Sequence, residues 1–482
     1  MFDVAIIGAG VVGGLIAREL SLYGLRICVL EKENDAATGA SAANSGIVHA
    51  GFDAKPGTLK AKFNVIGAEM MEAVCRELGV KYKRDGSLVV GFGPEDRKNI
   101  ELLLEKGRRN GVKRLDILGK EQLHTLEPGL SEAADCALWA PTAGIVCPYE
   151  LTFAAVGCAM DNGAKLFTNF RVCRIGRRTD GNPGYEIEAA DGRLIRAELV
   201  VNCAGVYSDR IAQMVGDNSF TITPRRGEYM LLDKTSGRLC THTVFRTPTK
   251  MGKGILVSPT VDGNTLLGPT SEDIGDKDDT SVTEAGLERI LSQVKQEFPG
   301  VNSGSVITSF CGLRAHGSTG DFVIGSPAPD FINAAAIESP GLTSSPAIAV
   351  HVRELAGGIL EAHGKKLVRD PDAVSGRKAL HWFRELSENE KNAVIAKEPE
   401  FGRIICRCEQ ITEGELRYAM RTDPRPADLD GVKRRTRAQM GRCQGGFCSP
   451  NIVRMLAEEL GIPFEAVTKS GAGSYINVGR TK

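Results

Sequence analysis

Apolar and polar positions change their spacing along this chain, and each change marks a predicted element. Residues 4–7 form a continuous apolar run before a glycine-rich turn, which predicts a buried strand. Residues 13–23 are expected to form a helix, and residues 26–30 a second strand that ends at Glu31. The first 32 residues therefore predict a strand, a tight turn, a helix and a strand.

Further along, the pattern separates buried strands from exposed ones. The apolar run 199–201 precedes Asn202, Cys203 and the Ala204-Gly205 turn, which suits a parallel strand ending near a cofactor. Between 221 and 270, short apolar runs alternate with Gly, Pro, Asp and Asn turns and predict an antiparallel sheet. Residues 81–92 predict a hairpin. Helices are predicted at 59–79, 283–298 and 345–362.

The last quarter of the chain is more charged. Residues 366–402 carry no glycine fingerprint, and we expect them to form a helical connector. A small cysteine-containing domain is expected at 403–460, followed by a tail at 461–482.

Composition narrows the class of protein. The 482 residues include 60 basic and 60 acidic side chains, so the charge gives no reason to expect nucleic-acid binding. Nine of the 13 cysteines are scattered singly, which indicates reduced core thiols rather than a secreted disulfide framework. The apolar N-terminus lacks a basic leading segment and a cleavage pattern, and no long uncharged apolar run follows. We therefore expect a cytoplasmic protein without a transmembrane segment.

Gly8, Gly10 and Gly13 form a G-x-G-x-x-G fingerprint between the first strand and the first helix. The first glycine permits the turn, the second lets the backbone approach a pyrophosphate, and the third allows close helix–strand packing. Glu31 lies 18 residues beyond Gly13, where a carboxylate can accept hydrogen bonds from a ribose. This context favours a dinucleotide site over an ordinary glycine turn, but leaves FAD and NAD open.

A second run of small residues, T-G-A-S-A-A-N-S-G-I-V-H-A-G at 38–51, surrounds one histidine. Its small side chains would let the backbone lie against a large planar ligand such as a flavin. An imidazole titrates near neutral pH, so His49 suits a general base. The alternative is a structural histidine bonded to the backbone, and the loop context favours the catalytic role.

Four cysteines near the C-terminus read C-R-C, a 34-residue gap and C-Q-G-G-F-C: Cys406, Cys408, Cys443 and Cys448. Two close pairs of thiolates can hold a metal ion or an iron–sulfur cluster. Structural zinc is the alternative, although the C-x-C pair is tighter than zinc sites usually have.

The segment N-S-G-I-V-H-A-G-F-D-A-K-P-G-T-L-K-A-K (44–62) resembles the flavin loop of the D-amino-acid-oxidase-like flavoproteins. Two subfamilies share this loop, the FAD-dependent glycerol-3-phosphate oxidases or dehydrogenases and the L-2-hydroxyglutarate dehydrogenases. Four later segments resemble the compact glycerol-3-phosphate oxidases: T-P-R-R-G-E-Y (223–229), G-K-G-I-L-V-S-P-T-V-D-G (252–263), L-L-G-P-T (266–270) and S-P-G-L-T-S-S-P-A-I-A (339–349).

This resemblance covers roughly residues 1–365 and implies an α/β fold with bound FAD. A Rossmann-like FAD-binding domain would comprise mainly 1–80, 145–220 and 310–365. An inserted antiparallel-sheet substrate domain would comprise mainly 81–144 and 221–309. Besides the fingerprint, the residues expected to bind the cofactor are Lys32, Ser41, Asn44, Ser45, Gly46, Val48, Ala204, Gly205, Gly341, Leu342 and Thr343.

A phosphorylated substrate needs fixed cations. By resemblance, Lys253 and Arg314 match positions that bind phosphate or carboxylate, and Ser344 matches a serine beside flavin and substrate. For each, the alternative is a surface or ion-pair role. Arg225 and Arg226 are expected to order the sheet or the flavin loop. Our hypothesis is that His49 removes the proton of the 2-hydroxyl group, with His316 the second candidate for that role.

The segment I-C-R-C-E-Q-I-T-E-G-E-L (405–416), together with D-G-V-K-R-R-T-R-A-Q-M-G-R-C-Q-G-G-F-C (430–448), resembles bacterioferritin-associated-ferredoxin-like [2Fe–2S] domains. The resemblance implies a small C-terminal helical iron–sulfur domain, which also ends the catalytic subunit of anaerobic glycerol-3-phosphate dehydrogenases. The compact oxidases lack it. Residues 403–442 hold ten Lys or Arg against six Asp or Glu. We expect the basic run 433–437 to support the cluster, rather than to dock a partner.

Together these patterns predict an FAD-dependent dehydrogenase that converts sn-glycerol 3-phosphate to dihydroxyacetone phosphate. The [2Fe–2S] centre would pass electrons singly to another protein. The rivals are an L-2-hydroxyglutarate, other 2-hydroxyacid or amine dehydrogenase on the same scaffold, and an electron-transfer subunit without its own substrate. The substrate is expected to be a small phosphorylated or carboxylated alcohol. The sequence leaves open whether the protein forms a homo- or a hetero-oligomer.

Overall fold

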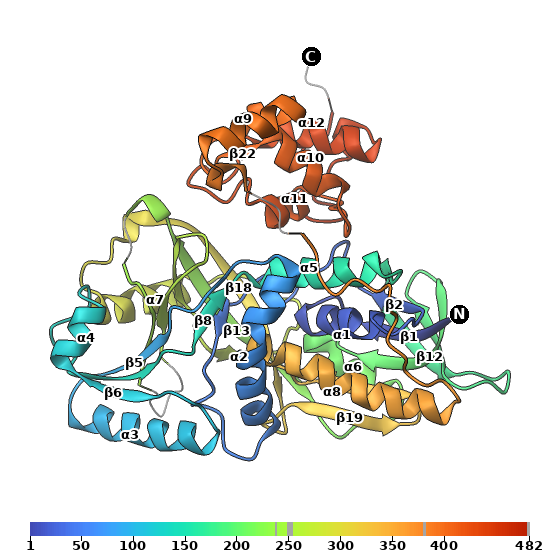
Figure 1. The fold of residues 1–482 in the computed structure, drawn as a ribbon, viewed down its shortest axis with the longest axis horizontal. Helices are drawn as coiled ribbons and strands as arrows, with labels where there is room; N and C mark the ends of the chain where they lie inside the picture. The colour runs from blue at the N-terminus through green and yellow to red at the C-terminus, as the bar shows by residue number, and fades with distance from the viewer. Residues whose placement is uncertain (237–238, 248–253, 379–381, 480–482) are drawn as a thin grey trace.

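The computed structural model describes residues 1–236, 239–247, 254–378 and 382–479. Figure 1 shows three parts: a parallel sheet with its helices, a large mixed sheet beside it, and a C-terminal helical module above helix α5 (Pro148–Asp161). No helix in these four described ranges is both long enough and apolar enough to cross a bilayer.

The parallel sheet carries the first and second predicted strands at its centre. Its parallel strands run in the order β9-β2-β1-β12-β20, and β19 (Val323–Ala328) adds to the edge antiparallel to β20. The bounds are β1 Phe2–Ile7, β2 Ile27–Leu30, β9 Lys165–Phe167, β12 Leu194–Asn202 and β20 Phe331–Ala335. The strands predicted at 4–7, 26–30 and 199–201 are confirmed. Their continuous apolar runs arise because both faces of this sheet are covered.

Alternate residues of these strands enter two separate cores. Val4, Ile6 and Val29 pack on one face under helices α1 (Val11–Ser21), α5 and α8 (Gly341–Ala362). Ala5 and Ile7 pack on the other face. That face is covered by the hairpin β10–β11 (Val172–Arg177, Tyr185–Ala189) and by α6 (Ser208–Gln213).

The large sheet has the strand order β17-β13-β16-β15-β14-β5-β7-β6, and β18 pairs with β13. Its pairs are antiparallel except for β14 with β5. The bounds are β5 Ser87–Gly91, β6 Asp116–Gly119, β7 Cys136–Ala140, β13 Ile222–Leu232, β14 Thr243–Arg246, β15 Leu256–Pro259, β16 Thr265–Gly268, β17 Glu272–Asp273 and β18 Val306–Gly317. The antiparallel sheet predicted at 221–270 is confirmed within the described residues. Helices α3 (Pro94–Arg109) and α7 (Glu284–Glu297) pack on this sheet.

The hairpin predicted at 81–92 is wrong. Its two halves, β4 (Tyr82–Lys83) and β5, belong to different sheets, because β4 pairs with β8 (Gly144–Val146) while β5 pairs with β7 and β14. The Asp85-Gly86 turn does bend the chain, and Gly86 has a φ of 76°. A turn signal reports that the chain bends, whereas the choice of partner strand depends on packing far away in the sequence.

The C-terminal module contains α9 (Glu388–Lys397), α10 (Glu413–Arg421), α11 (Leu429–Thr436) and α12 (Ser449–Leu460), with a two-stranded sheet of β21 (Ile404–Cys406) and β22 (Ile411–Thr412). Leu416, Val432 and Ile452 lie fully buried at its centre. The expected connector contains α9, and its Phe401 ring lies against Gly414 of α10. The expected tail begins by packing Val467 into the module core.

Helix α2 (Leu59–Leu78), predicted at 59–79, packs unusually closely on α8. The contact is made at Gly67, where a Cβ would clash with the carbonyl group of Thr343. Thr343 in turn accepts a hydrogen bond from the backbone N–H of His49 at 2.9 Å through Oγ1. The absence of a side chain at Gly67 therefore places the loop that carries His49.

We expect Gly67→Ala to destabilise the protein by about 1–3 kcal/mol, because the added methyl group overpacks the α2–α8 contact. The control is Gly358→Ala, on the exposed face of α8 with no heavy atom within 4 Å of the new Cβ. That change should stabilise the helix by roughly 0.5–1 kcal/mol. Chemical denaturation measures both. Equal effects of the two variants would contradict the proposed close contact.

Candidate functional site

A cavity of about 1100 Å³ lies between the parallel sheet and the large sheet. Its walls come from the β1–α1 turn, the end of β2, the 38–54 loop, the 203–207 turn, strands β13 and β18, and the start of α8. The carboxyl ends of parallel strands form one edge of it, which is where such sheets bind ligands.

The glycine fingerprint forms the floor of this cavity. Gly8 has a φ of 106°, and a Cβ there would clash with the carbonyl oxygen of Cys203 on the neighbouring strand. A Cβ on Gly13 would clash with the carbonyl oxygen of Gly8. Helix α1 begins at Val11, whose backbone N–H donates to Ser41 Oγ at 2.9 Å. The turn is therefore a bare backbone cradle at a helix N-terminus, the arrangement that binds a pyrophosphate.

Glu31 lies at the end of β2 and lines the cavity. Its carboxylate accepts backbone hydrogen bonds from Ala9 at 2.8 Å and from Glu33 at 3.0 Å. Burial raises the pKa of Glu31 and outweighs the opposing effect of these two donors. The side chain thus joins the glycine turn to the cavity wall.

The expected cofactor residues divide into two groups. Those that line the cavity are Gly8, Gly10, Glu31, Lys32, Ser41, Asn44, Ser45, Ala204, Gly205, Gly341 and Leu342. Gly13, Gly46, Val48 and Thr343 do not line it and lie behind the wall, where Gly13 and Thr343 hold the lining residues in place. The size of the cavity and its backbone cradle fit a dinucleotide as long as FAD.

One end of the cavity carries an aromatic and charged cluster, of which the sequence predicted only Lys32. Tyr207 donates a hydrogen bond from its hydroxyl group to Asp278 Oδ2 at 2.5 Å, and Lys32 Nζ lies 4.7 Å from the centre of its ring. Lys277 lies on the same ring at 5.8 Å. These residues come from segments far apart in the chain, so no local motif could have linked them.

His49 lines the cavity, and its backbone is held on both sides. Its N–H donates to Thr343 Oγ1 at 2.9 Å, and its carbonyl oxygen accepts from Asn64 Nδ2 at 2.6 Å. The centre of its imidazole lies 5.7 Å from that of Phe245. The side chain is therefore placed by its backbone and faces the large sheet across the cavity.

Arg314 lies on β18 and also lines the cavity. Its Nη2 donates to the carbonyl oxygen of Thr270 at 2.9 Å, and the described residues offer it no carboxylate partner. Burial raises the pKa of the neighbouring Tyr229, an effect that Arg314 opposes. Arg314 is a cation that faces the cavity with its charge available to a ligand.

The neighbouring arginines differ from Arg314. Arg225 donates to both oxygens of Asp273, at 2.6 and 3.0 Å, and Arg226 pairs with Asp279. Both ion pairs join β13 to β17 or to the segment that follows it, which agrees with the expected role in ordering the sheet.

The structure does not place the remaining expected substrate residues on the cavity wall. Lys253 lies outside the described residues. Ser344 is fully buried behind the cavity wall, and its Oγ has no hydrogen-bond partner among the described residues. His316 does not line the cavity; its Nδ1 lies 3.0 Å from Glu338 Oε1.

Lys60 and Glu338 line the cavity and were not anticipated. Lys60 Nζ bonds Glu338 Oε1 at 2.8 Å. Burial would raise the pKa of Glu338, but the hydrogen bonds from Lys60 and His316 outweigh it and lower the pKa. Lys60 was visible in the K-P-G-T-L-K motif, but its partner Glu338 is 278 residues away.

The four cysteines of the C-terminal module form two hydrogen-bonded thiol pairs, Cys406 with Cys448 and Cys408 with Cys443. A hydrogen bond from Cys448 lowers the pKa of Cys406 to about 6. Burial would raise the pKa of Cys443, but backbone N–H groups of the 445–447 turn and the Cys408 thiol lower it. No group of three or more His, Cys, Asp or Glu side chains among the described residues is arranged to hold a metal ion.

These thiols suit an iron–sulfur cluster chemically. In a [2Fe–2S] cluster each iron takes two protein ligands, so two pairs are the arrangement required. The sulfur atoms of Cys406 and Cys443 also accept hydrogen bonds from backbone N–H groups, which stabilise the thiolate forms that bind iron. Cys406 and Cys448 are buried, while Cys408 and Cys443 are half-buried.

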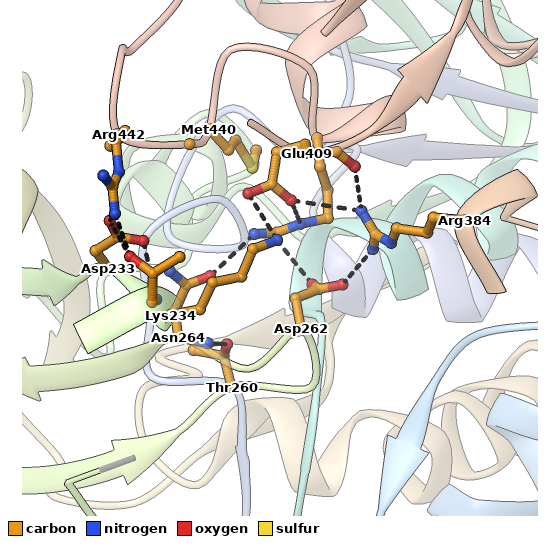
Figure 2. A network of polar contacts seen from close by, with 12 residues as sticks. Asp233, Lys234, Thr260, Asp262, Asn264, Arg384, Glu409, Met440 and Arg442 are labelled. Carbon is orange, nitrogen blue, oxygen red and sulfur yellow. Dashed lines mark hydrogen bonds and ion pairs between the residues drawn. The ribbon is translucent and has the colours of Figure 1, made fainter. Parts of the chain in front are cut away.

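The basic run 433–437 makes contacts that we did not expect. Arg434 and Arg435 pair with Asp35, and Arg437 pairs with Asp262, so the run attaches the module to the rest of the chain. Figure 2 shows part of this contact around Asp262 and Glu409. The sequence pattern showed the charge, but not the carboxylates that bind it.

Two family models match the chain in separate places. Residues 3–355 match the model described as FAD dependent oxidoreductase, and residues 404–458 match the BFD-like [2Fe-2S] binding domain. The matches coincide with the two sheet domains and with the cysteine module.

Individual proteins resemble the chain over different lengths. A protein from Caloramator mitchellensis named glycerol 3-phosphate dehydrogenase is 46% identical over 100% of this chain and 99% of its own. A Bos taurus protein named L-2-hydroxyglutarate dehydrogenase, mitochondrial, is 36% identical over 56% of this chain and 61% of its own. The structure of dithionite-reduced L-alpha-glycerophosphate oxidase from Mycoplasma pneumoniae with FAD bound is 30% identical, with a TM-score of 0.73. It covers 79% of this chain and 99% of its own.

We expect Gly13→Ala to lower the FAD content of the purified protein strongly, because the new methyl group displaces the Gly8 carbonyl and the pyrophosphate cradle with it. The flavin absorbance per polypeptide measures this. Gly14→Ala is the matched control, since its methyl group meets the Val156 side chain at 3.1 Å and no backbone atom closer than the Thr152 carbonyl oxygen at 3.4 Å. Equal FAD content in the two variants would rule out the cradle role of Gly13.

Proposed function

The chain belongs to the family of FAD-dependent oxidoreductases, and from that premise we propose that it oxidises sn-glycerol 3-phosphate to dihydroxyacetone phosphate. The observation that carries this proposal is Arg314, a cavity-lining guanidinium with no carboxylate partner among the described residues. A cation in this state favours an anionic substrate, and a guanidinium can bind two phosphate oxygens at once.

The proposal also rests on likeness over the whole length of the chain. The relative named glycerol 3-phosphate dehydrogenase matches both the sheet domains and the cysteine module. The relative named L-2-hydroxyglutarate dehydrogenase matches only 56% of the chain. This difference favours a phosphorylated alcohol over a 2-hydroxyacid.

Within the cavity, Arg314 would bind the phosphate and thereby fix the carbon that reacts. His49 would remove the proton from the hydroxyl group on that carbon. Bound FAD supplies a two-electron acceptor for the hydride. The Lys60–Glu338 pair would hold the α2 end of the cavity closed against water.

The cysteine module distinguishes the proposed reaction from that of an oxidase. The Mycoplasma pneumoniae oxidase is matched over nearly its whole length, yet that match covers only 79% of this chain. The four thiols would hold a [2Fe–2S] cluster, which transfers electrons singly. We therefore propose a dehydrogenase that delivers electrons to a protein acceptor.

We also propose that the protein works in the cytoplasm. All 13 cysteines are free thiols, and nine of them lie outside the cluster module. A chain with this many unpaired thiols suits a reducing compartment.

Anaerobic addition of sn-glycerol 3-phosphate should bleach the flavin absorbance, whereas L-2-hydroxyglutarate at the same concentration should leave it almost unchanged. The physical reason is the match between a dianionic phosphate and the Arg314 fork. If only L-2-hydroxyglutarate bleached the flavin, the proposed substrate would be wrong and a 2-hydroxyacid would take its place. Reduction only by a partner protein would identify an electron-transfer subunit.

Arg314→Ala should lower kcat/KM for glycerol 3-phosphate by roughly 30- to 150-fold, corresponding to about 2–3 kcal/mol for a lost charge-assisted contact. Arg174→Ala, at an exposed ion pair on β10, serves as the control. Steady-state kinetics with an artificial electron acceptor measures both. An Arg314 variant that retains the original kcat/KM would exclude this residue from phosphate binding.

His49→Asn should retain FAD but slow flavin reduction by substrate roughly 10²- to 10⁴-fold, the usual contribution of a general base. Stopped-flow absorbance under anaerobic conditions measures the rate, and the flavin spectrum before mixing confirms that the cofactor is bound. If the variant reduces its flavin at the normal rate, His49 has no part in proton removal.

A further inference from the structure

A buried network of ion pairs joins the C-terminal module to the large sheet (Figure 2). Its two carboxylates are Asp262, in the turn between β15 and β16, and Glu409, which directly follows Cys408. Only 3% and 1% of their side chains are exposed. Arg437 bonds both of them, with Nη1 at 2.8 Å from Asp262 Oδ2 and Nε at 3.1 Å from Glu409 Oε2.

Arg437 also has a third acceptor. Its Nη2 donates to Asn264 Oδ1 at 3.1 Å, and the amide of Asn264 donates to the carbonyl oxygen of Leu232 at 2.9 Å. One guanidinium therefore bonds to the module through Glu409 and to two positions of the sheet. Because these carboxylates are buried, loss of the Arg437 guanidinium leaves their charge less compensated, with little solvent to stabilise it.

The backbone of Arg437 is unusual in a way that points to its side chain. It ends α11 with a φ of 64°, a left-handed conformation at the position where glycine is usually found. A glycine would adopt this conformation with less strain. An arginine at such a position indicates that its guanidinium is needed for the contact it makes.

The other end of the network includes Arg384, from the segment that precedes α9. Its Nη2 lies 3.3 Å from Asp262 Oδ1 and its Nη1 lies 3.4 Å from Glu409 Oε2. Lys234 Nζ lies 3.1 Å from Glu409 Oε1. Glu409 is thus neutralised by cations from both sides of the contact, and Asp262 by two arginines from the C-terminal side.

A second contact also holds α11. Asp35, in the loop after β2, bonds both Nη atoms of Arg435 at 2.7 Å and Nη2 of Arg434 at 3.0 Å. The Arg435 guanidinium lies 3.9 Å from the ring centre of Phe153 on α5. Helix α11 is therefore attached to the FAD-binding part and, through Arg437, to the large sheet.

The network around Arg437 leads directly to the cysteines. Glu409 adjoins Cys408, and the chain runs from Arg437 to Cys443 in six residues. Within that stretch the sulfur of Met440 lies 3.6 Å from the hydroxyl group of Tyr149, and Arg442 bonds Asp233. The contact therefore fixes the loops that carry the thiols, and not only the outer surface of the module.

We infer that Arg437 is a positioning residue, which seats the cysteine module on the chain's own FAD-binding and substrate domains so that the thiols stay at a set distance from the large cavity. This inference rests on the proposed function, because the distance matters when electrons pass from bound FAD to a cluster at the four cysteines. The rate of such a transfer falls steeply with distance. The oxidation of the substrate inside the cavity does not depend on where the cysteine module sits.

The first test is hydrogen–deuterium exchange on the FAD- and cluster-loaded protein, comparing the unaltered chain with Arg437→Gly. Glycine suits the left-handed backbone, so the substitution removes the side chain without adding strain. We expect exchange to rise at least tenfold in both 260–264 and 429–437, while α10 and α12 keep their protection. Arg421→Ala, at an ion pair within the module, should leave the contact unchanged.

A second variant changes the residue on the other side of the contact. Asp262→Asn keeps the shape of the side chain, removes its charge and lies outside the module. If Arg437→Gly also deprotects α10 and α12, the module has unfolded, and Asp262→Asn alone decides. Normal exchange at 429–437 in that variant would then overturn the inference. If the module stays folded, unchanged exchange at 260–264 and 429–437 in both variants would also overturn the inference.

The second readout separates positioning from simple stability. After anaerobic mixing with glycerol 3-phosphate, Arg437→Gly should reduce its flavin at the normal rate but reduce the cluster at least tenfold more slowly. Arg437→Lys should restore part of that rate. Equal cluster reduction in the glycine variant and the unaltered protein would overturn the inference. If glycerol 3-phosphate fails to reduce the unaltered protein, the proposed function falls, while the exchange comparison still decides the role of Arg437.

Discussion

The close contact between Gly8, Gly13 and the Cys203 carbonyl determines where this protein can bind its cofactor. No side chain fits between these backbone segments, so the first strand, the first helix and β12 meet without a gap. The helix N-terminus is thereby aimed into the cavity, and Glu31 is drawn against the same turn. The parallel sheet contributes its strand ends and the large sheet faces them, which leaves room for a long, flat ligand between the two.

The arginines of strands β13 and β18 differ in whether a carboxylate neutralises them. Arg225 and Arg226 are neutralised by carboxylates and act on the sheet, whereas Arg314 pairs with no carboxylate in the described structure and donates to the Thr270 carbonyl oxygen. Three basic side chains on two adjacent strands therefore have different roles because of what lies opposite each. This is the basis on which we propose that Arg314 binds the phosphate of the substrate.

Local patterns were sufficient where local physics decides the structure. The strands at 4–7 and 199–201 and the glycine fingerprint followed from apolar runs and turn chemistry. The hairpin at 81–92 failed because its strands pair with distant partners. The Lys60–Glu338 pair was missed for the same reason, since its members lie far apart in the chain. The family resemblance supplied Arg314 and Ser344, but only the structure separates the cavity-lining residue from the buried one.

The charge of the basic run 433–437 does not by itself show which groups the run contacts. Counting charges suggested support for a negatively charged cluster, yet Arg435 and Arg437 each meet a buried carboxylate of another domain. Buried ion pairs contribute little net stability but are specific in geometry, because a misplaced partner leaves an uncompensated charge. Such a contact suits a junction where position matters more than strength. A module that must hold its thiols at a constant distance from the cavity has more use for that specificity than for a larger apolar interface.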